Sequence, residues 1–144
     1  MRLSTRTRYA VRAMLELAVN TSNIPVQLKT IAKHQDISVK YLEQLMATLK
    51  TAGFVRSVRG SKGGYLLAKP PNQIMLDRLF SCLEGPVITV ECVENDSFCD
   101  RAADCAPRLL WAELQEAIMR VLKSTTLQDL VDKTKTYAKA DYQI

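Results

Sequence analysis

Small and apolar residues recur with helical spacing along the first third of the chain. They predict three helices, over residues 5–19, 28–35 and 39–53. The inward positions are Ala10, Ala13, Met14, Leu17 and Ala18; then Leu28, Ile31 and Ala32; then Leu42, Leu45, Met46 and Leu49. Ser4 and Ser38 are candidate N-caps, and Gly53 suits the C′ position after the third helix. Residues 20–25, NTSNIP, break the first helix.

Two short extended runs follow the third helix, at residues 54–59 and 65–68. The segment between them, GSKGG, has three glycines in five residues, which favours a hairpin tip. Pro70 and Pro71 then end the unit. A helix pair followed by a glycine-tipped hairpin predicts a winged helix-turn-helix domain over residues 1–71. Such a domain inserts its second helix into the major groove of DNA and lays the wing along the backbone or the minor groove.

The second half of the chain reads as helical with one polar interruption. A short helix over residues 76–84 is stopped by Gly85 and Pro86, and Pro107 can begin a longer helix. The longer helix carries one apolar stripe: Leu110, Leu114, Ile118, Val121 and Leu122. Thr126 and Asp129 have capping-box spacing at the start of a last short helix, and residues 135–144 form a polar tail. The expected fold is therefore mainly α with a small β-hairpin wing.

Charge divides the chain in two. Residues 1–70 carry 12 Lys or Arg and 3 Asp or Glu, whereas residues 71–144 carry 8 and 12. The basic half is expected to meet a polyanion, although the winged unit could instead make only protein contacts. The outward residues of the third helix and the wing are the candidate DNA contacts: Ser38, Lys40, Tyr41, Glu43, Gln44, Arg56 and Arg59.

The polar interruption contains three of the four cysteines, Cys92, Cys99 and Cys105, with the spacing C-x6-C-x5-C. This spacing lacks the C-x2-C pair that is typical of structural zinc sites. Soft thiolate ligands favour an iron–sulfur cluster, zinc or copper(I), and a redox thiol switch or coincidence are the alternatives. Cys82 lies near an apolar stripe and is expected to be a small core residue.

Several functional classes have no support in the sequence. No apolar run approaches the ~20 residues of a membrane span, and the start does not read as a secretory signal, so we expect a cytoplasmic protein with reduced thiols. The GSKGG segment lacks the spacing of a phosphate-binding loop, and no nucleophile–base pair or catalytic carboxylate pair can be defended. The chain reads as a regulator and not as an enzyme.

Over nearly its whole length the chain resembles the IscR-type (Rrf-type) bacterial transcription regulators. The matching stretches are LSTRTRYAVRAMLELA, ISVKYLEQLMATLKTAGFVRSVRGSKGGYLLAKPP, LEGP and DCAPRLLWAEL. The resemblance implies a homodimer on a palindromic operator, with residues 72–134 forming a cluster-binding loop and dimerisation helices. It implies that Cys92, Cys99 and Cys105 hold an iron–sulfur cluster, 2Fe–2S in preference to 4Fe–4S. It also places Ser38, Glu43, Gln44 and Arg59 at DNA-reading positions.

Two positions depart from the family pattern. Where the best-studied type has a fourth ligand, a histidine three residues after the last cysteine, this chain has Arg108. Where nitric-oxide-sensing relatives take an acidic ligand from the first helix of the partner subunit, it has Arg8. The fourth ligand stays open among Glu94, Asp100, Asp104 and the only histidine, His34. A nitric-oxide-sensing repressor of the same fold, and a zinc or thiol interaction module without DNA function, remain alternatives.

Overall fold

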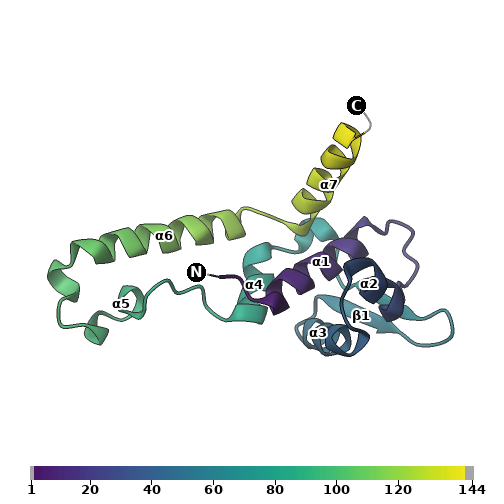
Figure 1. The fold of residues 1–144 in the computed structure, drawn as a ribbon, viewed down its shortest axis with the longest axis horizontal. Helices are drawn as coiled ribbons and strands as arrows, with labels where there is room; N and C mark the ends of the chain where they lie inside the picture. The colour runs from purple at the N-terminus through teal and green to yellow at the C-terminus, as the bar shows by residue number, and fades with distance from the viewer. Residues whose placement is uncertain (1, 142–144) are drawn as a thin grey trace.

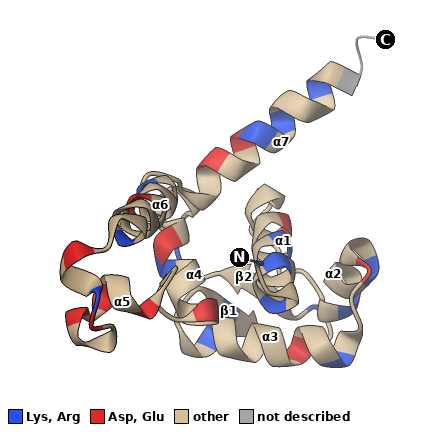
Figure 2. Cartoon of the chain, turned by 60° about the vertical axis from the view of Figure 1, so that its left-hand side comes forward, with Lys and Arg blue, Asp and Glu red and all other residues tan. Residues whose placement is uncertain are grey.

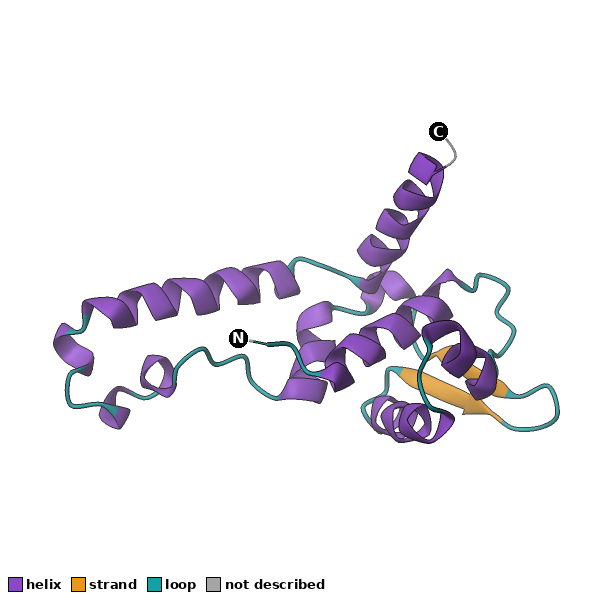
Figure 3. Ribbon diagram, viewed as in Figure 1, coloured by secondary structure: helices purple, strands orange, loops and turns teal. Residues whose placement is uncertain are grey.

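The computed structural model describes residues 2–141 and consists of a winged domain with a helical arm (Figure 1). In the winged domain, α1 (Thr5–Val19), α2 (Leu28–Gln35) and α3 (Val39–Thr51) precede an antiparallel hairpin of β1 (Val55–Val58) and β2 (Gly64–Leu67). The pairing register sets Val55 opposite Leu67 and Val58 opposite Gly64. Figure 3 shows these two strands below α1, with α3 beside them. The predicted helices, hairpin and inward faces are confirmed, with Leu28 only partly buried.

The two predicted helix N-caps, Ser4 and Ser38, are confirmed. The Ser4 side chain accepts a hydrogen bond from Thr7 N, and the Ser38 side chain accepts one from Tyr41 N. Each hydroxyl satisfies a backbone donor that the first helical turn leaves without a partner. Asp36 ends α2 in the left-handed region, at φ 53°, which allows the tight turn into α3.

The arm follows the hairpin. A single turn, η1 (Pro71–Gln73), leads to α4 (Leu76–Glu84), and a cysteine-bearing segment of short turns then reaches α6 (Ala106–Lys123). Those turns are α5 (Glu91–Glu94), η2 (Asp96–Phe98) and η3 (Ala102–Asp104). Figure 1 shows α5 and most of α6 extending away from the winged domain.

The last helix is longer than its pattern predicts. Instead of a short helix and a polar tail, α7 (Leu127–Asp141) continues to the end of the described residues, and residues 142–144 of the predicted tail lie outside them. The extension contains lysine and alanine, which favour helix, and no glycine or proline. Thr126 and Asp129 form the expected capping box, with Thr126 N donating to Asp129 Oδ2 at 2.7 Å.

One hydrophobic core joins the two halves of the chain. It includes residues of α1, α3, β1 and α4, together with Leu122 at the end of α6 and Leu127 and Val131 in α7. The α6 stripe lies largely outside this core, because Leu110, Leu114 and Val121 are exposed in the single chain. Their exposed fractions are 51%, 46% and 61%, whereas that of Leu122 is 8%.

Candidate nucleic-acid interface and cysteine loop

The outer face of α3 is polar because its inner face supplies the core. Leu42, Leu45, Met46 and Leu49 are buried, and residues one or two positions away on the helix therefore point outward. Lys40, Glu43 and Gln44 are exposed, whereas Tyr41 is half-buried with its ring edge-on to Tyr9 at 6.0 Å between centroids. Ser38 is exposed, but its hydroxyl also serves as the N-cap.

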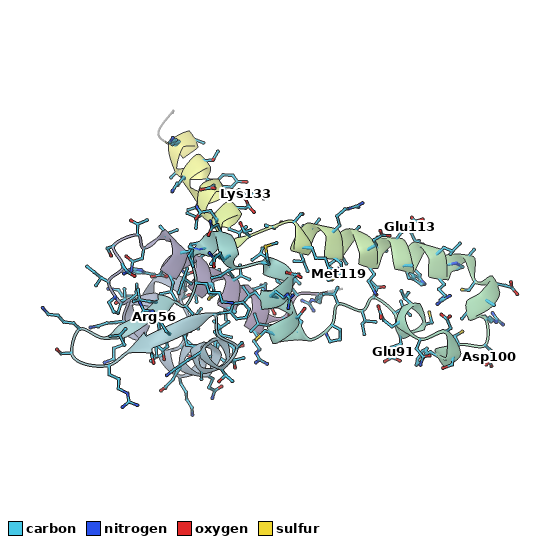
Figure 4. All side chains as sticks on the ribbon, turned by 180° about the vertical axis from the view of Figure 1, so that it is seen from behind. Arg56, Glu91, Asp100, Glu113, Met119 and Lys133 are labelled. Atoms are coloured by element: carbon cyan, nitrogen blue, oxygen red, sulfur yellow. The ribbon has the colours of Figure 1, made fainter. Side chains whose placement is uncertain are left out.

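The hairpin adds two exposed cations, of which Arg56 lies beside the end of α1 and Gln128 of α7 and not beside α3. Arg56 is exposed on β1 and Arg59 is exposed where the strand ends (Figure 4 labels Arg56). Lys50 of α3 donates to the hydroxyl of Ser57 at 2.7 Å, which ties the helix to the hairpin. Figure 2 shows basic residues over α1, α2 and α3 and acidic residues gathered around α5. The charge division of the sequence is therefore also a division in space.

Sequence reasoning missed two contacts that position this interface. The backbone of Val26 pairs with that of Tyr65 in β2, with N···O distances of 3.0 and 2.8 Å, and so anchors the wing to the loop before α2. Arg6 of α1 donates to the hydroxyl of Thr48 on α3 at 3.3 Å, beside Gln44. In the sequence, Arg6 is marked only as one of several basic residues along the first helix. Nothing in the sequence marks the Val26–Tyr65 pair.

Glu84, at the end of α4, accepts a hydrogen bond from Ser4 N at 3.0 Å, at the N-terminus of α1. Hydrogen bonding to the Ser4 hydroxyl, and then to the Thr7 hydroxyl, lowers the pKa of the Glu84 carboxyl from its usual 4.5. A carboxylate with a lowered pKa stabilises the fold fully above its usual pKa, and this contribution is lost as the pH falls through the lowered value.

Glu84→Gln is therefore expected to lower the free energy of unfolding by about 0.5 kcal/mol at pH 7, because an exposed charge at a helix N-terminus is partly screened. The difference from the unmodified chain should vanish once the pH is below the lowered pKa. Urea unfolding of both chains from pH 7 to pH 3 measures it. Glu113→Gln, at an exposed position on α6, is the matched control and should show no such convergence. A Glu84→Gln difference that persists at pH 3 would contradict the charge effect.

The cysteine loop, residues 91–105, lies at the far end of the arm, where Figure 4 labels Glu91 and Asp100. Cys92 lies in α5 and is half-buried, Cys99 follows η2 and is exposed, and Cys105 is the half-buried residue before α6. Cys82 is a free, half-buried thiol in α4, so the prediction that it is a core residue is only partly confirmed. All four are free thiols.

The thiols are not gathered around one point. Among residues 2–141, no group of three or more His, Cys, Asp or Glu side chains is arranged to hold a metal ion. The donor types suit an iron–sulfur cluster, but the arrangement of this loop does not fit one. Arg108 takes part in holding this arrangement, since its Nε donates to the carbonyl oxygen of Cys92 at 2.7 Å.

The candidate fourth ligands are also dispersed. Glu94 accepts a hydrogen bond from Gln115, while Asp100 and Asp104 are exposed. His34 is far along the chain on α2, and its Nδ1 lies 2.7 Å from a carboxylate oxygen of Glu16 on α1. None of these side chains joins the cysteines in a ligand group within the described part of the chain.

Comparison with known proteins decides the family. The model of the Rrf2 family, described as an iron-dependent transcriptional regulator, matches residues 3–133. The chain belongs to the Rrf2 family. Within it, the protein rrf2 of Nitratidesulfovibrio vulgaris is 42% identical over 131 residues, which are 91% of this chain and 87% of that protein. The regulator IscR of Pectobacterium atrosepticum is 39% identical over 143 residues, 99% of this chain and 87% of that one.

A solved Rrf2-family structure has the same fold. The structure of CymR, the global cysteine regulator of B. subtilis, matches with a TM-score of 0.80 and 39% identity, covering 92% of this chain and 98% of that one. The expectations of a winged-helix fold and of a regulator rather than an enzyme are confirmed. The chain is a DNA-binding transcription regulator. Among the helices of residues 2–141, none combines the length and apolar character needed to cross a membrane.

Proposed function

We propose that this Rrf2-family regulator binds a palindromic operator in the cytoplasm as a homodimer, and that the three thiols of the cysteine loop control which operators it binds. The observation that carries the DNA-binding part is the exposed polar face of α3, to which the hairpin adds the exposed Arg56 and Arg59. On this face Glu43 and Gln44 would read base edges, and Ser38, Lys40 and Tyr41 would hold phosphates. Arg56 and Arg59 would contact the backbone or the minor groove.

The homodimer is supported by the uncovered apolar surface of α6. Leu110, Leu114 and Val121 are exposed, and Val121 lines a groove of about 610 Å³ that also includes Leu3 and Ile88. Contiguous apolar surface of this kind is rare on a monomer and marks an interface. A second copy of α6 has the matching apolar stripe, and a two-fold dimer of this kind would read a palindrome.

For the thiols we propose an iron–sulfur cluster, 2Fe–2S in preference to 4Fe–4S. Support comes from the three thiolate donors on one short loop and from the iron-dependence in the family's description. Because the observed loop does not fit a cluster, binding would require the loop to rearrange. A second candidate is control by thiol oxidation without a metal, which the four free thiols and the exposure of Cys99 favour.

The DNA-binding assignment is tested at two positions on α3. Gln44→Ala should weaken binding to the cognate operator by about 1–3 kcal/mol and change binding to random DNA little, because a base-edge contact is specific. Lys40→Ala should weaken both and reduce the salt slope by about one unit, because a phosphate contact is not specific. Fluorescence anisotropy at several salt concentrations measures these effects.

Lys135→Ala, at an exposed position on α7, is the charge-matched control and should bind as the unmodified chain does. An equal loss for Gln44→Ala on all DNA would assign Gln44 to the backbone contacts. The cluster assignment is tested separately by iron and sulfide counting on anaerobically purified protein. Iron and sulfide in equal amounts support it, whereas a colourless protein free of both overturns it and leaves thiol oxidation or zinc.

A further inference from the structure

Arg108 connects three separate parts of the cysteine loop through one side chain. Its Nε donates to Cys92 O at 2.7 Å, its Nη1 donates to Ala102 O at 3.3 Å, and its Nη2 contacts the Asp96 carboxylate. These acceptors belong to α5, η3 and η2 respectively. The Arg108 side chain is 23% exposed, whereas that of Asp96 is 84% exposed. The guanidinium is therefore enclosed by the loop that it binds.

The loop has few other means of holding its shape. Its backbone hydrogen bonds are local turns, such as Val93 N to Val90 O and Ala102 N to Cys99 O. Within residues 91–105, Ala102 is the one buried side chain, at 8% exposure. Among the described hydrogen bonds, the side-chain ties from this loop to α6 come from Arg108 and from Gln115, which bonds Glu94.

The negative charge of the cysteine loop also favours the position of the Arg108 guanidinium. Residues 91–105 contain five acidic side chains and one basic one, Arg101. A cation placed among them reduces the repulsion between carboxylates. The planar guanidinium of arginine presents five N–H donors in fixed directions, so it can bond two carbonyl oxygens and a carboxylate together, which the single ammonium of lysine does less well.

We propose that Arg108 is a positioning residue: it holds the cysteine loop folded while the thiols are free, and it must release the loop before the thiols can converge on a common ligand. The first half of this inference stands on the contacts alone. The second half rests on the proposed function. With the guanidinium bonded between Cys92 and Ala102, the backbone around the thiols is fixed in an arrangement that brings no three ligands together.

Cysteine alkylation in the reduced, metal-free chain tests the first half, with the rate at each thiol followed by mass spectrometry. In Arg108→Ala, the half-buried Cys92 and Cys105 should react about tenfold faster, because charge-assisted hydrogen bonds no longer oppose opening of the loop. Cys99 is already exposed and should change little. Cys82 lies in α4, outside the loop, and should not change.

Arg101→Ala removes an exposed cation of the same loop and is the matched control, with rates like those of the unmodified chain. Arg108→Lys should give intermediate rates at Cys92 and Cys105. The inference is overturned if Arg108→Ala leaves these two rates unchanged. It is also overturned if the alkylation rates of all four thiols rise by the same factor, since that pattern indicates general destabilisation of the chain.

The second half is tested by anaerobic reconstitution with ferrous iron and sulfide. Arg108→Ala should take up iron faster than the unmodified chain, because no release of the loop then precedes binding, and an equal or slower rate overturns the release step. If Arg108→Ala takes up none while the unmodified chain does, Arg108 is required for binding and the release step is wrong. If the alkylation pattern holds and neither chain takes up iron, Arg108 still positions the loop, the release step falls, and the cluster part of the proposed function is wrong.

Discussion

Replacing Gly64 with alanine is expected to lower the free energy of unfolding by about 3 kcal/mol, because the new methyl group has no space. A Cβ at this position would overlap the carbonyl oxygen of Val26 and lie 2.9 Å from Gln27 N. Both are backbone atoms, so no side chain can move to make room. The clash falls at the paired backbones of Val26 and Tyr65, which join the wing to the rest of the domain.

Urea unfolding followed by circular dichroism measures this effect. Ser61→Ala is the matched control at the exposed tip of the same wing, and its stability should lie within about 0.5 kcal/mol of that of the unmodified chain. Gly64→Ala should also bind DNA more weakly, because the wing loses its anchor. Equal unfolding midpoints for the two variants would contradict the close approach of Gly64 to Val26.

Replacing Cys92, Cys99 and Cys105 together with alanine is expected to abolish iron binding and operator discrimination and to leave the chain folded. The core does not depend on these thiols, because none of the three is fully buried. The free energy of unfolding should change by about 1 kcal/mol or less. Iron content, operator binding and circular dichroism on the same preparation measure the three outcomes.

Cys82→Ala is the control for this experiment and should keep both iron and operator discrimination, because Cys82 lies in α4 outside the loop. An unfolded triple variant would instead indicate a structural zinc site, in which the free energy of metal binding is part of the free energy of folding. A folded triple variant with unchanged operator preference would remove the thiols from the regulatory mechanism.

The helices of the winged domain and their inward faces follow from the sequence because their signals are local. The spacing of Ala10, Met14 and Leu17 is repeated within one helix, and the caps at Ser4 and Ser38 lie beside the donors they satisfy. The hairpin follows equally from the glycines of GSKGG between two extended runs. The length of α7 does not follow from the sequence. Its last turns show no apolar stripe that would predict a helix, and they contain no glycine or proline that would predict where it ends.

The arrangement of the cysteine loop could not be predicted from local sequence signals. Sequence by itself determined the winged helices, the polar face of α3 and three thiols on one short segment. Only the tertiary structure decided that Arg108 bonds between α5, η2 and η3, that the thiols stay apart, and that the α6 stripe is exposed. The bonds of Arg108 and the separation of the thiols depend on how the loop folds against α6, which no local pattern encodes. A hydrophobic pattern shows which face of a helix is apolar, but it does not show what covers that face.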